Sequence, residues 1–214
     1  MLLTLLDLVG SLAFALSGAS RAIERRLDPF GIAFLAFVAA TSGGIVRDVL
    51  IGTTPPSAIA SWHYCAIACL AGAAVWFAHG AITRLSAPVA FFDALGLGVF
   101  AVVGTRRALE AGLSPVMAAM LGMMSAIGGG IGRDILTAQT PMVLQKDIYA
   151  LAALLGGSIV AFGSTFGSSD TITATIGASL ATGLRLIALK KGWNLPIIGP
   201  RGAAQTTEKD EPRI

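Results

Sequence analysis

The chain has few of the residues on which catalytic and metal-binding sites depend. It contains 2 cysteines and 2 histidines in 214 residues, and charged residues make up only 13% of it. Two cysteines in one apolar run cannot form the disulfide framework of a small secreted domain. We find no nucleophile–base set, phosphate loop or redox motif in the sequence. We therefore expect no enzyme, no cofactor and no metal site. We also expect no nucleic-acid partner, because the basic residues lie in loops and the tail.

Apolar sequence and glycine are what the chain has in excess. Hydrophobic residues make up 55% of it, with 26 glycines, and the mean hydropathy is +0.77. Soluble domains carry about 25% charged residues, so this composition is typical of an integral membrane protein. The glycine excess favours closely packed transmembrane helices. The predicted fold class is therefore an all-α membrane protein.

An internal duplication organises the apolar sequence. Residues 7–55 align with residues 93–141 at a constant offset of 86, without a gap, and 21 of the 49 positions are identical. Each copy opens with an aspartate, contains Gly-Gly-Ile-x-Arg-Asp and closes with Thr-Pro. Two unrelated apolar segments would agree at only a few positions. We infer two copies of one structural unit.

Seven apolar runs predict seven membrane spans. They cover residues 2–19, 29–50, 62–78, 91–103, 115–137, 148–162 and 171–189. These lengths suit a hydrocarbon core that takes about 20 helical residues to cross. The first run has no basic flank and no obvious cleavage site, so we expect a retained span and not a signal peptide. The expected organisation is one transmembrane domain at 1–189, with repeats at about 3–79 and 90–165, a seventh helix at about 170–189, and a cytoplasmic tail at 190–214.

An odd number of spans in each repeat predicts that the second copy is inverted in the membrane relative to the first. The distribution of basic residues then favours an outer N-terminus and an inner C-terminus. The expected inner residues are Arg21, Arg25, Arg26, Arg84, Lys146, Lys190, Lys191, Arg201, Lys209 and Arg213. Arg106 and Arg107 fall on the outer side.

A glycine cluster followed by Arg-Asp lies in the second and fifth spans. The candidate pathway residues are Ser42, Gly43, Gly44, Arg47 and Asp48 in the first copy, and Gly128, Gly129, Gly130, Arg133 and Asp134 in the second. Glycines at a helix bend free backbone carbonyls, which a bilayer tolerates only where they face protein or water. We expect each helix to break at its glycines, with the first Arg-Asp pair toward the outer face and the second toward the inner face.

Plainer interpretations exist for these residues. An Arg-Asp pair near a helix end can be an interfacial anchor with a snorkelling arginine, and glycines can simply be packing surfaces. The presence of the motif at both faces favours a pathway instead, because ionisable residues in membranes tend to face a bundle interior or cavity.

Three further candidates are ionisable residues outside the motif. Asp7 and Asp93 open the first and fourth spans, where each is a helix N-cap, an interfacial carboxylate or a pore-facing carboxylate. Arg185, near the inner end of the last span, either snorkels or contacts a lipid headgroup or the pore. Cys65 and Cys69 are expected to pack as small apolar side chains.

The duplicated pattern resembles the prokaryotic branch of the trimeric intracellular cation (TRIC) channels. The resemblance covers residues 3–190 and rests on two copies of three helices plus a seventh, with Gly-Gly-x-x-Arg-Asp after a proline-started second and fifth helix. It implies a homotrimer in a prokaryotic inner membrane, in contact with membrane lipids. It also implies that each subunit has a water-filled pore for potassium or other monovalent cations, lined and gated by helices kinked at the paired glycines. The lysine-bearing lipid signature of animal members is absent from this sequence.

The same residues also fit a secondary transporter. Arginine grips a carboxylate with two parallel hydrogen bonds and aspartate holds an ammonium group, so the pair suits a small zwitterion such as glycine. Inverted repeats are as natural in transporters as in channels. A third possibility, a structural or lipid-organising membrane protein, predicts that the motif charges are dispensable.

Overall fold

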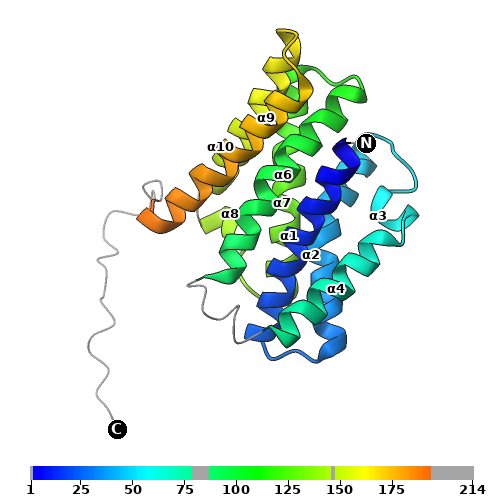
Figure 1. Ribbon diagram of the computed structural model, residues 1–214, viewed down its shortest axis with the longest axis vertical. Helices are drawn as coiled ribbons and strands as arrows, with labels where there is room; N and C mark the ends of the chain where they lie inside the picture. The colour runs from blue at the N-terminus through cyan, green and yellow to red at the C-terminus, as the bar shows by residue number, and fades with distance from the viewer. Residues whose placement is uncertain (1, 79–86, 146–147, 194–214) are drawn as a thin grey trace, which may run out of the picture.

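Helices make up every regular element in the part of the chain that the computed structural model describes, residues 2–78, 87–145 and 148–193. They are α1 (Leu2–Glu24), α2 (Pro29–Leu50), α3 (Ser57–Ala60), α4 (His63–Phe77), α6 (Pro88–Glu110), α7 (Pro115–Leu136), α8 (Met142–Gln145), α9 (Ile148–Thr165) and α10 (Asp170–Lys191) (Figure 1). The predicted all-α class is confirmed.

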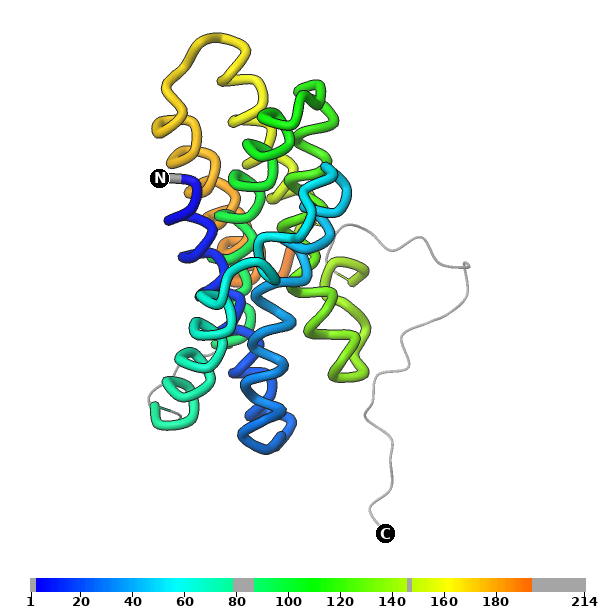
Figure 2. Tube along the Cα trace, turned by 90° about the vertical axis from the view of Figure 1, so that its right-hand side faces the viewer, coloured from blue at the N-terminus to red at the C-terminus, as the bar shows by residue number. Residues whose placement is uncertain are grey.

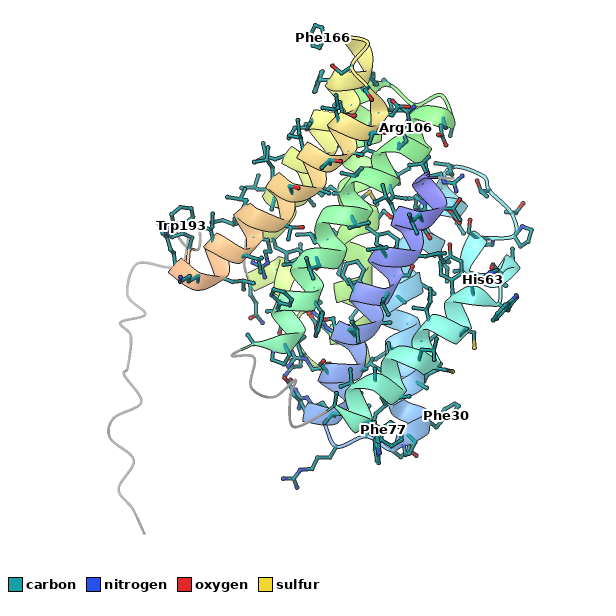
Figure 3. All side chains as sticks on the ribbon, viewed as in Figure 1. Phe30, His63, Phe77, Arg106, Phe166 and Trp193 are labelled. Carbon is teal, nitrogen blue, oxygen red and sulfur yellow. The ribbon has the colours of Figure 1, made fainter. Side chains whose placement is uncertain are left out.

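Six of these helices are long and apolar enough to cross a membrane: α1, α2, α6, α7, α9 and α10. The helix at the third expected span, α4, has 15 residues and is shorter than a full crossing. Large apolar side chains project from the periphery of the bundle, among them Phe30, Phe77 and Phe166 (Figure 3). Such a surface suits contact with lipid acyl chains.

Two helices extend well beyond the expected spans. The first expected span stops at residue 19, whereas α1 continues to Glu24. The fourth was expected at 91–103, whereas α6 runs from Pro88 to Glu110. Arg21 and Arg107 therefore lie in the last turns of helices and not in loops, where a cation is favoured by the helix dipole. The backbone hydrogen bonds of both helices continue through the charged residues that follow each apolar run. Both helices therefore end later than their apolar runs do.

The second and fifth helices begin at prolines, as predicted. Asp28 caps α2 by accepting a hydrogen bond from the backbone N–H of Gly31 at 2.7 Å, and Pro29 is its first residue. Pro115 is likewise the first residue of α7, although the side chain of Ser114 before it makes no capping hydrogen bond. Proline suits this position because the first helical N–H has no partner within the helix.

Four helices form the centre of the bundle. The packed pairs are α1 with α2, α6 with α7, α1 with α6, and α2 with α7; α4 covers α1 and α2, while α9 and α10 cover α6 and α7. Figure 2 shows that the turn between α1 and α2 and the turn between α6 and α7 lie at opposite ends of the molecule. The two copies of the motif therefore run in opposite directions.

The motif glycines lie where α2 crosses α7, and both helices are continuous through them. A Cβ on Gly43 would collide with the carbonyl oxygen of Ser125, and one on Gly129 would lie 2.5 Å from the carbonyl oxygen of Ala39. Ser42 Oγ donates to the carbonyl of Gly128 at 2.9 Å. The expected helix breaks are therefore absent from this conformation. Unbroken helices satisfy their own backbone in a bilayer, and the glycines let two backbones touch.

Candidate functional site

A cluster of buried charges surrounds Arg47 in the last turn of α2. Arg47 Nη1 donates to Asp7 Oδ1 of α1 at 3.1 Å, and Arg47 Nε donates to Asp48 Oδ1 at 2.8 Å. Tyr64 of α4 donates its hydroxyl to the other oxygen of Asp7 at 2.5 Å. We call Asp7, Arg47, Asp48 and Tyr64 the first cluster.

The short helix α3 closes one side of the first cluster. The backbone N–H of Ser57 donates to Asp48 Oδ2 at 2.8 Å, so both oxygens of Asp48 are bonded. A cavity of about 10 Å³ lies beside these groups, with Gly44 and Phe100 also on its wall. A cavity of that size has room for roughly one water molecule. Because the cavity has a polar lining and room for about one water molecule, the first cluster can be hydrated.

The second cluster repeats this arrangement around Arg133 in the last turn of α7. Arg133 Nη1 donates to Asp93 Oδ1 of α6 at 2.6 Å, and Arg133 Nε donates to Asp134 Oδ1 at 2.8 Å. The backbone N–H of Met142 donates to Asp134 Oδ2 at 3.0 Å, as that of Ser57 does in the first cluster. We call Asp93, Arg133, Asp134 and Tyr149 the second cluster.

Several polar atoms of the second cluster have no hydrogen-bond partner among the described residues. They are Asp93 Oδ2, Arg133 Nη2 and the hydroxyl of Tyr149, all fully enclosed. They gather around Gly130, where a Cβ would lie 2.7 Å from the Tyr149 hydroxyl and 3.1 Å from Asp93 Oδ1. Buried polar groups normally find partners, so this cluster is left incomplete where the first is complete.

Arg185 of α10 joins the second cluster. Its guanidinium carbon lies 4.7 Å from the centre of the Tyr149 ring, and Arg185 Nη2 lies 4.0 Å from the sulfur of Met142. Its side chain is buried, with 1% of the residue exposed. The interpretation of Arg185 as a snorkelling residue is therefore wrong: the side chain turns inward onto an aromatic face.

The plainer interpretations of Asp7 and Asp93 are also wrong. Both residues lie inside their helices and are buried in ion pairs with the motif arginines, so neither is an N-cap or an interfacial carboxylate. The thiols of Cys65 and Cys69 are exposed on α4 and do not pack into the core. Sequence alone could not decide which side of α4 faces outward.

The two clusters lie toward opposite ends of the α2–α7 pair. Ala39 faces Gly129 and Gly43 faces Ser125, so the helices are antiparallel and Arg133 lies level with Leu35. That level is about twelve residues from Arg47, or roughly 18 Å along the helix. Phe14 lies against Gly129 and Phe100 against Gly44, and the centres of the two rings are 5.5 Å apart.

The chain is similar in sequence to a transporter family model and to several bacterial membrane proteins. A family model described as glycine transporter matches residues 4–80 and 90–165. The UPF0126 membrane protein of Deinococcus radiodurans is 40% identical over 158 residues, covering 72% of this chain and 73% of that protein. The UPF0126 inner membrane protein YadS of Escherichia coli K12 is 33% identical over 201 residues, covering 92% and 95%.

Solved structures of TRIC channels share the fold. The TRIC trimeric intracellular cation channel orthologue from Rhodobacter sphaeroides has a TM-score of 0.84 at 33% identity and covers 90% of this chain and 99% of its own. A prokaryotic TRIC channel determined in 0.5 M KCl also gives 0.84, at 32% identity, covering 91% and 99%. The chain belongs to the prokaryotic branch of the TRIC family. It is accordingly a multi-pass protein of the bacterial inner membrane.

In this TRIC-family chain, the sequence did not point to three further residues that contact the charged groups of the clusters. They are Tyr64, Tyr149, and Ser17, whose hydroxyl accepts a hydrogen bond from Arg133 Nη1 at 2.6 Å. A signal for the tyrosines was present, because each is the second residue of its helix and the two lie 85 positions apart. The gapless alignment stops at the Thr-Pro that closes each copy, and one residue fewer follows in the second copy. Ser17 had no such signal, since its counterpart is Val103.

Proposed function

We propose that the chain is a cation channel that passes potassium through each subunit of a homotrimer, along a route between α2 and α7. The observation that supports it most is the pair of buried Arg-Asp-Asp clusters at opposite ends of these two helices. Ionisable groups inside a membrane bundle are costly and mark ion pathways. The solved relatives are described as cation channels.

The clusters are proposed as the two mouths of this route. With the N-terminus outside, the first cluster lies toward the outer face and the second toward the inner face, related by an inverted repeat whose third and sixth spans are α4 and α9. In this arrangement α4, although short, crosses the membrane together with α3 and the loop that precedes α3. Neither Arg84, Lys146 nor the tail beyond residue 193 lies in the described part of the chain, so the orientation rests on sequence.

The chemistry of the clusters suits weak cation binding. Asp7 and Asp93 each present a carboxylate that is shared with an arginine, so a passing ion meets an attractive group whose charge is partly neutralised. Conduction needs such weak sites, because an ion that binds tightly does not leave.

Phe14 and Phe100 are proposed as the closed part of the route. They are buried and in contact, and Phe100 also lines the cavity of the first cluster. An apolar constriction between two polar ends blocks ions by excluding water. The rings lie on α1 and α6, so opening would move these two helices apart while α2 slides against α7 at Gly43 and Gly129. The glycines then act as a moving contact, and no helix break is needed.

A transporter of glycine is the second candidate. It is favoured by the description of the matching family model and by the unpartnered groups of the second cluster. Arg133 Nη2 and the Tyr149 hydroxyl suit a carboxylate, and Asp93 Oδ2 suits an ammonium group.

The test is potassium flux from liposomes that contain the purified protein, under an imposed voltage, with and without a glycine gradient. A channel gives fast, voltage-driven potassium flux that ignores glycine. Asp7→Asn is expected to reduce it several-fold, whereas Cys69→Ser, a control on the exposed face of α4, leaves it unchanged. Liposomes that hold potassium but accumulate glycine would replace the channel with the transporter.

A further inference from the structure

Arg185 differs from the two motif arginines in its charge balance. Arg47 and Arg133 each contact two carboxylates within 3.1 Å. Arg185 forms no ion pair within the described ranges, and its Nε has no hydrogen-bond partner there. Its contacts are the ring of Tyr149 and the sulfur of Met142.

Burial of a guanidinium that has no ion pair among the described residues is costly, since an isolated buried charge carries a large desolvation penalty. An aromatic face returns only part of that cost. A position that merely holds α10 in place would be filled more stably by an apolar side chain, as at its neighbour Ala181. We therefore infer that the positive charge of Arg185 has a function at this position.

We propose that Arg185 is an electrostatic barrier to cations at the second cluster, and that it limits potassium conductance through that end of the route. This inference rests on the proposed channel function. Two arginines and two aspartates meet at the second cluster, whereas one arginine and two aspartates meet at the first. Counted over these described residues, the second cluster with Arg185 is formally neutral, whereas the first carries one negative charge. The residue responsible comes from α10, the helix that lies outside the duplication.

Tyr149 also differs from its counterpart in hydrogen bonding. Tyr64 donates to Asp7, whereas the hydroxyl of Tyr149 has no partner among the described residues and its ring lies against the guanidinium of Arg185. In R185Q we expect Tyr149 to donate to the carboxylate of Asp93, whose Oδ1 lies beside the same glycine as the Tyr149 hydroxyl. Removing Arg185 would then make the second cluster resemble the first.

Single-channel recording of the full-length protein in planar bilayers tests the proposal, with wild type, R185Q and R185K. R185Q is expected to raise potassium conductance about threefold or more in 0.05 M KCl. The increase should shrink in 1 M KCl, where the Debye length is about 3 Å and a fixed charge is screened. R185K keeps the charge and should stay close to wild type at both concentrations. No carboxylate in the described ranges is paired with Arg185, so R185Q should fold; R185M, apolar and of similar length, replaces it if assembly fails.

The outcomes separate the two proposals. Conducting wild type with an unchanged R185Q, or an increase that is independent of salt and shared by R185K, overturns the barrier and leaves the channel. A silent wild type beside a conducting R185Q supports both, with Arg185 holding the route shut. Silence in wild type and every variant overturns both.

Discussion

The first and second clusters each contain one arginine, two aspartates and one tyrosine at corresponding positions, but their surroundings differ. In the first, every one of these side chains has a hydrogen-bond partner and a cavity lies alongside. In the second, Ser17 adds a bond to Arg133, Arg185 adds a charge, and three polar atoms of the cluster are left without partners. Duplicated sequence thus produced duplicated ion pairs. The two ends became unequal through Ser17, where the copies differ, and through Arg185, on the helix outside the duplication.

Removal of the motif arginines should give the largest difference in stability between the two clusters. Arg47→Ala leaves Asp7 and Asp48 buried without a cation, which should lower the free energy of unfolding by about 3–5 kcal/mol. Arg133→Ala should cost less, because Arg185 remains near the abandoned carboxylates. The thermal midpoint of each purified variant in detergent, followed by size-exclusion chromatography, gives the order. A larger loss for Arg133→Ala would contradict the compensating role of Arg185.

The tyrosines sharpen the difference in hydrogen bonding. Tyr64→Phe removes the donor to Asp7 and should cost about 1.5–3 kcal/mol, the value of a hydrogen bond to a charged group. Tyr149→Phe removes a hydroxyl that has no partner among the described residues, so it should lower the free energy of unfolding much less than Tyr64→Phe does. Thermal midpoints measured side by side test this contrast. Equal losses would mean that the Tyr149 hydroxyl is bonded in solution.

The glycines that face the clusters give a smaller contrast. A Cβ on Gly130 would lie 2.7 Å from the Tyr149 hydroxyl, whereas the nearest atoms to one on Gly44 lie at 3.7 Å. Gly130→Ala should therefore cost about 1–3 kcal/mol through overpacking. Gly44→Ala should be neutral or slightly stabilising, since alanine favours the helix. The denaturation midpoints of the two variants test this difference. A Gly130→Ala variant as stable as wild type would show that Tyr149 moves aside freely.

The contacts of the fold could be predicted from the sequence only in part. The repeat, the helix starts at Pro29 and Pro115 and the all-α class follow from local patterns. The unbroken path of α2 and α7 does not, because glycine in a membrane helix permits both a bend and a close contact. The partner decides between them: the carbonyl of Ser125 lies against Gly43, and that of Ala39 against Gly129.

What the sequence determined by itself is the membrane character, the duplication and the identity of the charged residues at each end, since composition and spacing are local properties. Only the tertiary structure decided that Asp7 and Asp93 pair with the motif arginines 40 positions away, and that Arg185 enters one cluster and not the other. The physical reason is that a buried charge takes its partners from neighbouring helices. Which helices are neighbours is a property of the packed bundle.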